Sequence, residues 1–283
     1  MGPFIRGLVR LFRGHRGFQK YIRYLHFFYF NSNNLDFATN GEAWLAQRIS
    51  KYSSSNSLIL DIGCNEGEYL ALFFDNSCDF KGKVIAADAM EEVLIILKER
   101  FSFLGNRISV HSTAISNISG TTFFYKWVDS TLRNCNSLGD MNSIGFKDGI
   151  VKSVINVKTI PDLLKNEALE LCDVFILKLD IEGAEFLALE GARSLLGSNN
   201  RPHVIQFEFG ISARAFNINF FNISNLLNKF SYDIFVLGES YLMRISNPVL
   251  IDNLYEHGNF IAISSSIPKE LFTELIHNVK TIF

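Results

Sequence analysis

The chain of 283 residues is 48% hydrophobic and 20% charged, with a formal net charge of -2, which excludes intrinsic disorder, collagen-like repetition and a coiled-coil rod. Every apolar run stops well short of the ~18–20 residues of a membrane-spanning helix, so we expect no span. Four scattered cysteines without a C-x-x-C pair predict free thiols. Together with the lack of a recognisable secretory signal, they indicate a cytoplasmic protein.

Residues 1–40 are predicted to form a basic helical extension, and residues 41–283 a single domain. Six of the 27 basic residues precede Asp36, which is the first acid, so the rest of the chain carries 21 basic and 29 acidic residues and a net charge of -8. Nucleic-acid binding needs clustered Lys and Arg, so this acidic body argues against it.

Within the extension, apolar side chains recur every three or four residues from Phe4 to Tyr29. This spacing predicts an amphipathic helix, which Gly14 and Gly17 weaken. One interpretation is a helix that lies on anionic lipid at the inner face of a membrane. The preferred interpretation is docking on its own domain or on a second subunit of a homo-oligomer, and all three stay open.

From residue 42 onward, predicted strands and helices alternate, which is typical of a parallel sheet with right-handed crossovers. The seven expected strands are 58–62, 83–88, 108–114, 173–180, 203–208, 234–237 and 259–264. Helices are expected at 42–52, from Tyr69, and at 91–103, 184–196 and 220–230. Two β-prone runs at 121–128 and 154–159 flank a polar loop at 134–145 and predict an inserted hairpin or flap. The expected fold is therefore doubly wound α/β and Rossmann-like.

A glycine turn follows the first expected strand. Its pattern Asp61-x-Gly63-x-Asn65-x-Gly67 joins an apolar strand to a helix, where glycines allow a ligand to approach the backbone closely. The next strand ends on Asp88, whose carboxylate would accept both hydroxyls of an adenosine ribose. These features predict a nucleoside-cofactor site.

Charge discriminates between the cofactors that such a site accepts. A dinucleotide brings a pyrophosphate to the turn, and a phosphate loop often carries a Lys. Here Asp61 and Glu66 lie in or beside the turn and Lys is absent from it. Two acids repel a pyrophosphate but attract the ammonium and sulfonium groups of S-adenosylmethionine, which is therefore the predicted cofactor.

A second group of polar residues ends the fourth and fifth parallel strands. Because side chains alternate along a strand, Lys178 and Asp180 are expected to point to the same side, and so are Gln206 and Glu208 on the next strand. Ligands of open α/β sheets bind at this edge. We predict that Asp180, helped by Lys178 or Glu208, positions or deprotonates a substrate hydroxyl. A carboxylate pair of this kind would also suit Mg²⁺, although no metal site is predicted. The structural alternative is a Lys–carboxylate pair that orders the strand end.

The six histidines include no H-x-x-x-H pair, and no G-x-S-x-G elbow supports a serine nucleophile. A histidine base stays open, although we expect each histidine to be structural or exposed.

These motifs, in this order, resemble the FkbM-type methyltransferases. The resemblance covers about residues 58–210. It rests on 60–69 (LDIGCNEGEY), Asp88, Ala114, 157–164 (VKTIPDLL), 178–185 (KLDIEGAE), 191–192 and Glu208. It implies a class I methyltransferase fold and O-methylation with S-adenosylmethionine. Two departures from the usual pattern are Cys64, where a small residue such as Ala is common, and Asp88-Ala89, where Glu-Pro is frequent.

The resemblance assigns residues to the two halves of a reaction site. The expected cofactor contacts are Asp61, Gly63, Cys64, Asn65, Gly67, Asp88, Ala89 and Ala114, and the expected catalytic residues are Asp180, Lys178 and Glu208. Residues before 40 and after 210 lie outside the shared motifs and are expected to shape substrate choice.

The resulting hypothesis is an O-methyltransferase whose acceptor is a hydroxyl of a small molecule or a glycan, with a sugar in a cell-surface glycan or glycolipid as the preferred acceptor. The glycan rests on the resemblance alone. Two alternatives are a non-catalytic, membrane-associated partner in glycan assembly and an adenine-dinucleotide oxidoreductase. The intact turn argues against the first, and its acidic charge argues against the second.

Overall fold

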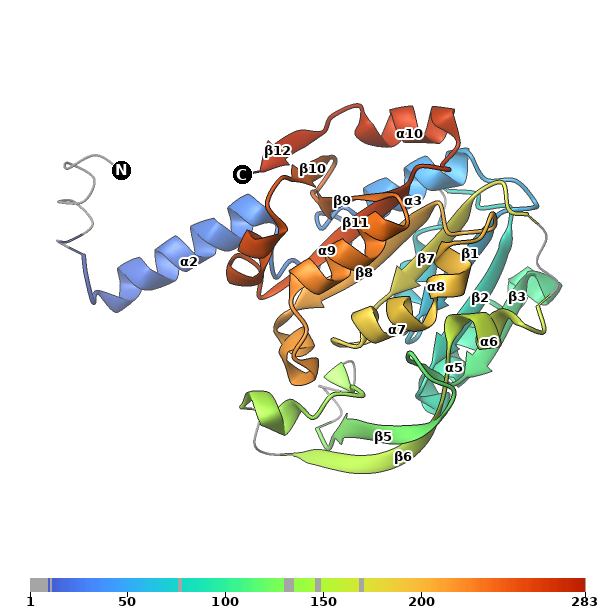
Figure 1. Cartoon of the computed structure of the whole chain (residues 1–283), viewed down its shortest axis with the longest axis horizontal. Helices are drawn as coiled ribbons and strands as arrows, with labels where there is room; N and C mark the ends of the chain where they lie inside the picture. Colours follow the sequence, from blue (N-terminus) through green and yellow to red (C-terminus); the bar gives the residue numbers. More distant parts are fainter. Residues whose placement is uncertain are drawn as a thin grey trace.

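A mixed β-sheet organises the protein (Figure 1). The computed structural model describes residue 10 and residues 12–75, 78–129, 135–145, 149–167 and 171–282. In that part of the chain the sheet strands are β1 (Leu58–Ile62), β2 (Lys83–Asp88), β3 (Ile108–Ser112), β7 (Phe175–Leu179), β8 (Val204–Gly210), β9 (Tyr232–Leu237), β10 (Leu242–Ile245), β11 (His257–Ser264) and β12 (Lys280–Ile282). Their order is β12-β10-β9-β11-β8-β7-β1-β2-β3.

Strand directions confirm the predicted fold class. The run β3-β2-β1-β7-β8 is parallel throughout, β11 is antiparallel to both of its neighbours, and β9 follows it. These seven strands have the order and directions of the class I methyltransferase fold. Strands β10 and β12 extend the edge beyond β9 and were not predicted, because each is short and carries no clear apolar alternation.

Two hydrophobic cores cover the two faces of the sheet, because successive strand residues point to opposite sides. In β1, Leu58 and Leu60 join one core and Ile59 joins the other. The first core is packed by α6 (Ile160–Leu164), α7 (Glu185–Gly191), α8 (Arg193–Leu196) and α9 (Phe220–Lys229). The second is packed by α3 (Glu42–Lys51), α4 (Glu68–Ala71), α5 (Glu91–Arg100) and α10 (Lys269–Ile276). The predicted helix 184–196 is therefore two helices, separated at Ala192.

The predicted inserted hairpin is confirmed. Strands β5 (Gly120–Trp127) and β6 (Ile150–Lys158) pair antiparallel, and β4 (Ala114–Ile115) joins β6. Of the predicted polar loop, Asn134 lies outside the described residues. Ser137 bridges back to Tyr125, and its hydroxyl donates to the carbonyl oxygen of Glu182 over 2.7 Å. This bond fastens the flap to the carboxyl edge of the main sheet.

Helix α2 (Arg16–Phe30) extends away from the sheet at its N-terminal end (Figure 1). Its C-terminal half packs on its own domain through an Arg23–Glu256 ion pair of 2.6 Å and a contact of 2.6 Å between His26 Nε2 and the carbonyl oxygen of Leu254. A turn at Gly14 (φ 82) precedes the helix, so the described part of the predicted apolar stripe is interrupted there. The part of the stripe at residues 4–9 and 11 lies outside the described residues. Among the described residues, no helix has the length and apolar character to cross a membrane.

Four short 3-10 helices complete the described elements: η1 (Ser102–Arg107), η3 (Met141–Ile144), η4 (Ile211–Phe216) and η5 (Pro248–Asn253).

Candidate active site

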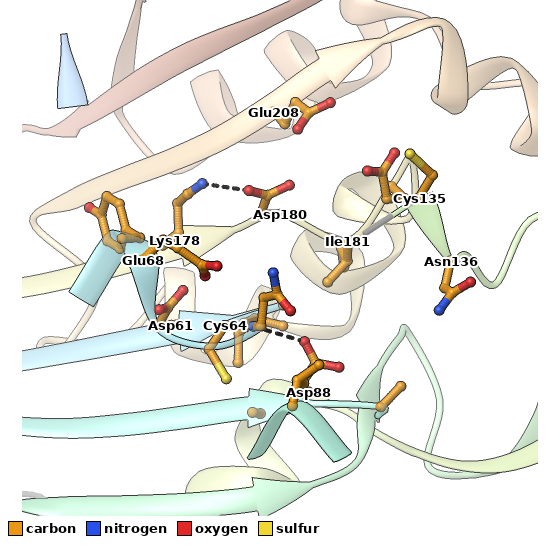
Figure 2. Close-up of a pocket in the computed structure, with 18 of the residues that line it drawn as sticks. Asp61, Cys64, Glu68, Asp88, Cys135, Asn136, Lys178, Asp180, Ile181 and Glu208 are labelled. Atoms are coloured by element: carbon orange, nitrogen blue, oxygen red, sulfur yellow. Dashed lines mark hydrogen bonds and ion pairs between the residues drawn. The ribbon is translucent and has the colours of Figure 1, made fainter. Parts of the chain in front are cut away.

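A cavity of about 620 Å³ opens at the carboxyl ends of β1, β2, β7 and β8 (Figure 2). This is the edge where open α/β sheets bind ligands. All of the predicted site residues line it except Gly67. Gly67 instead begins α4 at φ 82, where a Cβ atom would lie 2.4 Å from the ring of Phe101. Glycine is therefore required at position 67 because a side chain there would collide with Phe101, which follows α5.

The turn after β1 passes very close to the end of β7. Gly63 has φ 78, and a Cβ atom there would lie 1.8 Å from the carbonyl oxygen of Asp180. The N–H of Gly63 donates to the carbonyl oxygen of Ala87 over 2.8 Å, which ties the turn to β2. Only glycine permits this approach, so the turn brings the predicted cofactor residues to the predicted catalytic strand.

The carboxylate of Asp88 lies at the end of β2 and holds the turn in place. Its Oδ2 accepts the N–H of Asn65 over 3.0 Å (Figure 2). Its Oδ1 accepts the N–H of Met90 over 2.8 Å. Burial raises the pKa of Asp88 and these hydrogen bonds partly offset that effect. A carboxylate has about four acceptor positions, so Asp88 keeps acceptor capacity for a ribose hydroxyl.

Asp61 and Tyr69 place unpaired polar atoms beside the same cavity. In the described part of the chain, Asp61 Oδ2 and the Tyr69 hydroxyl are buried without a hydrogen-bond partner. Burial raises the pKa of Asp61 to about 7, although Lys178 opposes the shift. Buried polar atoms normally have partners, so these two fit a cationic, hydrogen-bonding ligand such as S-adenosylmethionine.

Lys178 connects β7 to the start of α3. Its Nζ lies 2.8 Å from Asp180 Oδ2 and 3.4 Å from Glu42 Oε1, and Glu42 also accepts from the side-chain amides of Gln206 and Asn40. Burial opposes the charge of Lys178, but Asp180 and Glu42 raise its pKa well above the ordinary value. The ammonium is therefore fixed between two carboxylates.

Asp180 remains 37% exposed and faces the cavity. Burial favours its neutral form, but the charge of Lys178 and the hydrogen bond that Lys178 donates hold the pKa of Asp180 below its usual value. The predicted pair of Lys178 and Asp180 thus exists, whereas Gln206 is fully buried against Glu42 and does not line the cavity.

Glu208 and His257 form a pair that was not predicted. His257 Nδ1 lies 2.6 Å from Glu208 Oε1, and both residues line the cavity. Burial and the neighbouring Asp180 raise the pKa of Glu208. The predicted strand began at Asn259, two residues late, so His257 was left in the preceding loop. Its position as the first residue of β11 places it next to β8.

Glu185 supports the strand end. Its carboxylate accepts the N–H groups of Ile181 (3.0 Å) and Gly183 (3.2 Å), and burial raises its pKa to about 8. These bonds fix the backbone between β7 and α7.

The rim of the cavity comes from two distant segments. The flap contributes Cys135, Asn136 and Leu138, and the segment after α2 contributes Asn33, Asn34, Leu35 and Phe37. No local pattern in the sequence indicated that residues 33–40 reach the site. Among the described residues, no cluster of three or more His, Cys, Asp or Glu side chains is arranged to hold a metal ion.

Three solved structures show the range of similarity. The methyltransferase FkbM of Methylobacillus flagellatus KT is 17% identical, with a TM-score of 0.46 over 73% of this chain and 44% of that one. A SAM-dependent O-methyltransferase of Thermotoga maritima is 8% identical (TM-score 0.37, 81% and 65% covered). A precorrin-6y C5,15-methyltransferase of Geobacter metallireducens GS-15 is 12% identical (TM-score 0.39, 78% and 86% covered).

This chain therefore spans less than half the length of the M. flagellatus protein. No curated protein sequence matches it significantly. The family model of the methyltransferase FkbM domain, in contrast, matches residues 61–234, from the cofactor turn to β9. The chain belongs to the FkbM family of methyltransferases, and its cofactor is S-adenosylmethionine, as its acidic turn predicted.

Proposed function

We propose that this protein methylates a hydroxyl group of a neutral sugar, in a cell-surface glycan or glycolipid. The observation that carries the proposal is the position of Asp180. This carboxylate faces the cavity beside the turn after β1 and is kept ionised by Lys178. The pair of Glu208 and His257 lines the same cavity. Such a group accepts a hydrogen bond from a hydroxyl and holds its oxygen in place.

The cofactor half of the cavity is supplied by β1, β2 and β4. Asp88 would hold the ribose hydroxyls, and Asp61 and Tyr69 would hold the ammonium of the amino-acid end. The apolar wall of this half of the cavity is formed by Cys64, Ala89, Met90, Val93, Ala114 and Ile115. When bound, S-adenosylmethionine supplies a methyl group on a positively charged sulfur.

The acceptor half is supplied by β7, β8, the flap and the segment after α2. Its charged groups are mainly acidic, so a phosphate or carboxylate on the acceptor would be repelled. The side-chain amides of Asn33, Asn34 and Asn136 lie at the rim and match the hydroxyls of a neutral sugar. Holding two reactants aligned contributes up to ~7–11 kcal/mol to the barrier reduction.

The first prediction concerns the reaction itself. Incubation with S-adenosylmethionine and a panel of methyl glycosides should give a product that carries one additional methyl group, detected by mass spectrometry. Asp180→Asn should lower kcat about 10²-fold and leave the calorimetric Kd of S-adenosylmethionine unchanged, because Asp180 contacts the acceptor.

Asp233→Asn is the matched control, since Asp233 is 61% exposed and pairs with Arg244 at 3.9 Å. Full activity of Asp180→Asn would reject the role of Asp180. Binding of S-adenosylmethionine with no transfer to any hydroxyl would favour the non-catalytic alternative, and binding of NADH alone would favour an oxidoreductase.

The exposed face of α2 supports peripheral binding to the anionic inner face of a membrane. Tyr21, Tyr24, Leu25 and Phe28 recur at helical spacing and are 44–82% exposed. They lie on a different side of α2 from Arg23, His26 and Phe30, which contact the domain. Aromatic side chains enter the lipid interface, and basic residues add about 1 kcal/mol each near anionic lipid.

A second prediction tests this membrane contact. Tyr21→Ser combined with Phe28→Ser should reduce flotation with phosphatidylserine-containing liposomes several-fold, because the apolar anchor is lost. Point variants are preferable to a deletion of residues 1–35, because that deletion would also remove residues 33–35 from the cavity rim. Phe221→Ser is the control, as Phe221 is 49% exposed on α9. Equal flotation of all variants would reject lipid binding by α2.

A further inference from the structure

We infer that His257, oriented by Glu208, is the group that takes the proton from the acceptor hydroxyl. The inference rests on the proposed function and assigns to a histidine the role first predicted for Asp180. Asp180 then positions the hydroxyl, and Glu208 positions the histidine.

The geometry of the pair leaves one ring nitrogen available. His257 Nδ1 lies 2.6 Å from Glu208 Oε1, and the side chain of His257 is 24% exposed towards the cavity. In the described residues, no hydrogen bond reaches Nε2. A carboxylate at Nδ1 selects the neutral tautomer with the proton on Nδ1, so that Nε2 presents a lone pair.

The competing carboxylate is a weaker base. Asp180 Oδ2 is bound by Lys178 at 2.8 Å, and the pKa of Asp180 lies below the ordinary value because Lys178 opposes the effect of burial. A base is most efficient when its pKa lies near the operating pH. An imidazole meets this condition, whereas a carboxylate fixed to an ammonium does not.

The charges around His257 come from several elements. Glu208 on β8 and Asp180 on β7 face it directly, and Lys178 on β7 opposes them. The preceding residue, Glu256, is paired with Arg23 of α2, and Glu182 and Cys135 lie on the same cavity wall. Burial favours the neutral ring, but Glu208 raises the pKa of His257 above its usual 6.5.

The segment after α2 fixes the backbone of His257. The Ser32 hydroxyl and the Asn33 N–H both donate to the His257 carbonyl oxygen over 2.9 Å. The ring is therefore held at two points, by Glu208 through the side chain and by residues 32–33 through the main chain.

The proton step is balanced within these groups. The lone pair of Nε2 forms an N–H bond while the hydroxyl O–H bond breaks and leaves its electron pair on oxygen. The resulting imidazolium is stabilised by Glu208, and it returns the proton to water after the product leaves.

One test needs no acceptor. In protein labelled with ¹⁵N-histidine, long-range ¹H–¹⁵N spectra should show the Nδ1–H tautomer of His257, with a pKa above 6.5. Glu208→Gln should lower this pKa by about 1–3 units, because an opposite charge is removed. An Nε2–H tautomer, or a pKa that Glu208→Gln does not change, would overturn the pair.

The kinetic test uses the same variants. The kcat of the wild-type protein should rise with pH through the His257 pKa, since only the neutral ring accepts a proton. His257→Gln should lose about 10²–10⁴-fold in kcat and abolish this rise, with an unchanged Kd for S-adenosylmethionine. His277→Gln, at an exposed histidine after α10, should behave as wild type.

If the kcat of His257→Gln still rose with pH as in the wild-type protein, the proton acceptor would be a carboxylate and not His257. A wild-type protein that methylates no sugar would reject the proposed function, while the tautomer and pKa of His257 still test the pair.

Discussion

Replacing Lys178 with methionine is expected to lower the free energy of unfolding by about 3–5 kcal/mol. The side chain is 4% exposed and pairs with Asp180 and Glu42. It also offsets the charge of the buried Asp61. Methionine would fill most of the volume but leave these carboxylates without a counter-charge. Urea unfolding at pH 8 measures the loss.

The loss should shrink as pH falls below 7. Asp61 has a pKa of about 7 in the folded protein and would protonate still more readily without Lys178. Its protonation removes one of the uncompensated charges. Because the folded pKa of Lys178 is raised, its contribution is present below its unfolded pKa of ~10.4 and disappears as pH rises through the folded value.

Lys51→Met is the matched control. Lys51 is 63% exposed and lies 3.5 Å from Glu274, so its removal should cost at most about 1 kcal/mol. Equal losses in the two variants, or a Lys178→Met loss that does not vary with pH, would contradict the assigned role of Lys178.

Asp88→Ala is expected to weaken S-adenosylmethionine binding about 10²-fold or more. Two hydrogen bonds from ribose hydroxyls to a carboxylate contribute about 1.5–3 kcal/mol each, and alanine also releases the N–H groups of Asn65 and Met90 that hold the turn. Calorimetric titration gives the Kd directly.

Glu92→Ala, at an exposed acid on α5, should bind as wild type. Thermal unfolding of Asp88→Ala separates a folded protein with a damaged site from an unfolded one. Unchanged affinity in a folded Asp88→Ala protein would place the ribose elsewhere.

Local sequence patterns were sufficient to predict which residues at the ends of β1 and β2 line the cavity, whereas their contacts with the cofactor stay a prediction. The Gly63 turn follows the short apolar strand β1 and Asp88 ends β2, so strand ends and glycine positions were sufficient to bring them together. Lys178 and Asp180 were predicted by the same reasoning, since parallel strands end at one edge.

The side of the cavity formed by β8 and β11 depends on contacts between distant segments. Gln206 and Glu42 meet across 164 positions of the chain, and nothing near Glu42 marks that acid as buried. His257 was missed because it is the first residue of β11. The predicted strand began two residues later, at Asn259, so His257 was assigned to the preceding loop. The domain boundary at residue 40 stays a prediction, although residues 33–40 form part of the cavity wall.

The attachment of α2 to the strand that carries His257 has a thermodynamic consequence. Arg23 and His26 hold Glu256 and Leu254, and residues 32–33 hold His257 itself. A ligand that draws α2 away from these contacts would loosen the histidine and reduce affinity for the acceptor. By reciprocity of linked equilibria, bound acceptor would oppose the release of α2 to the same extent in free energy.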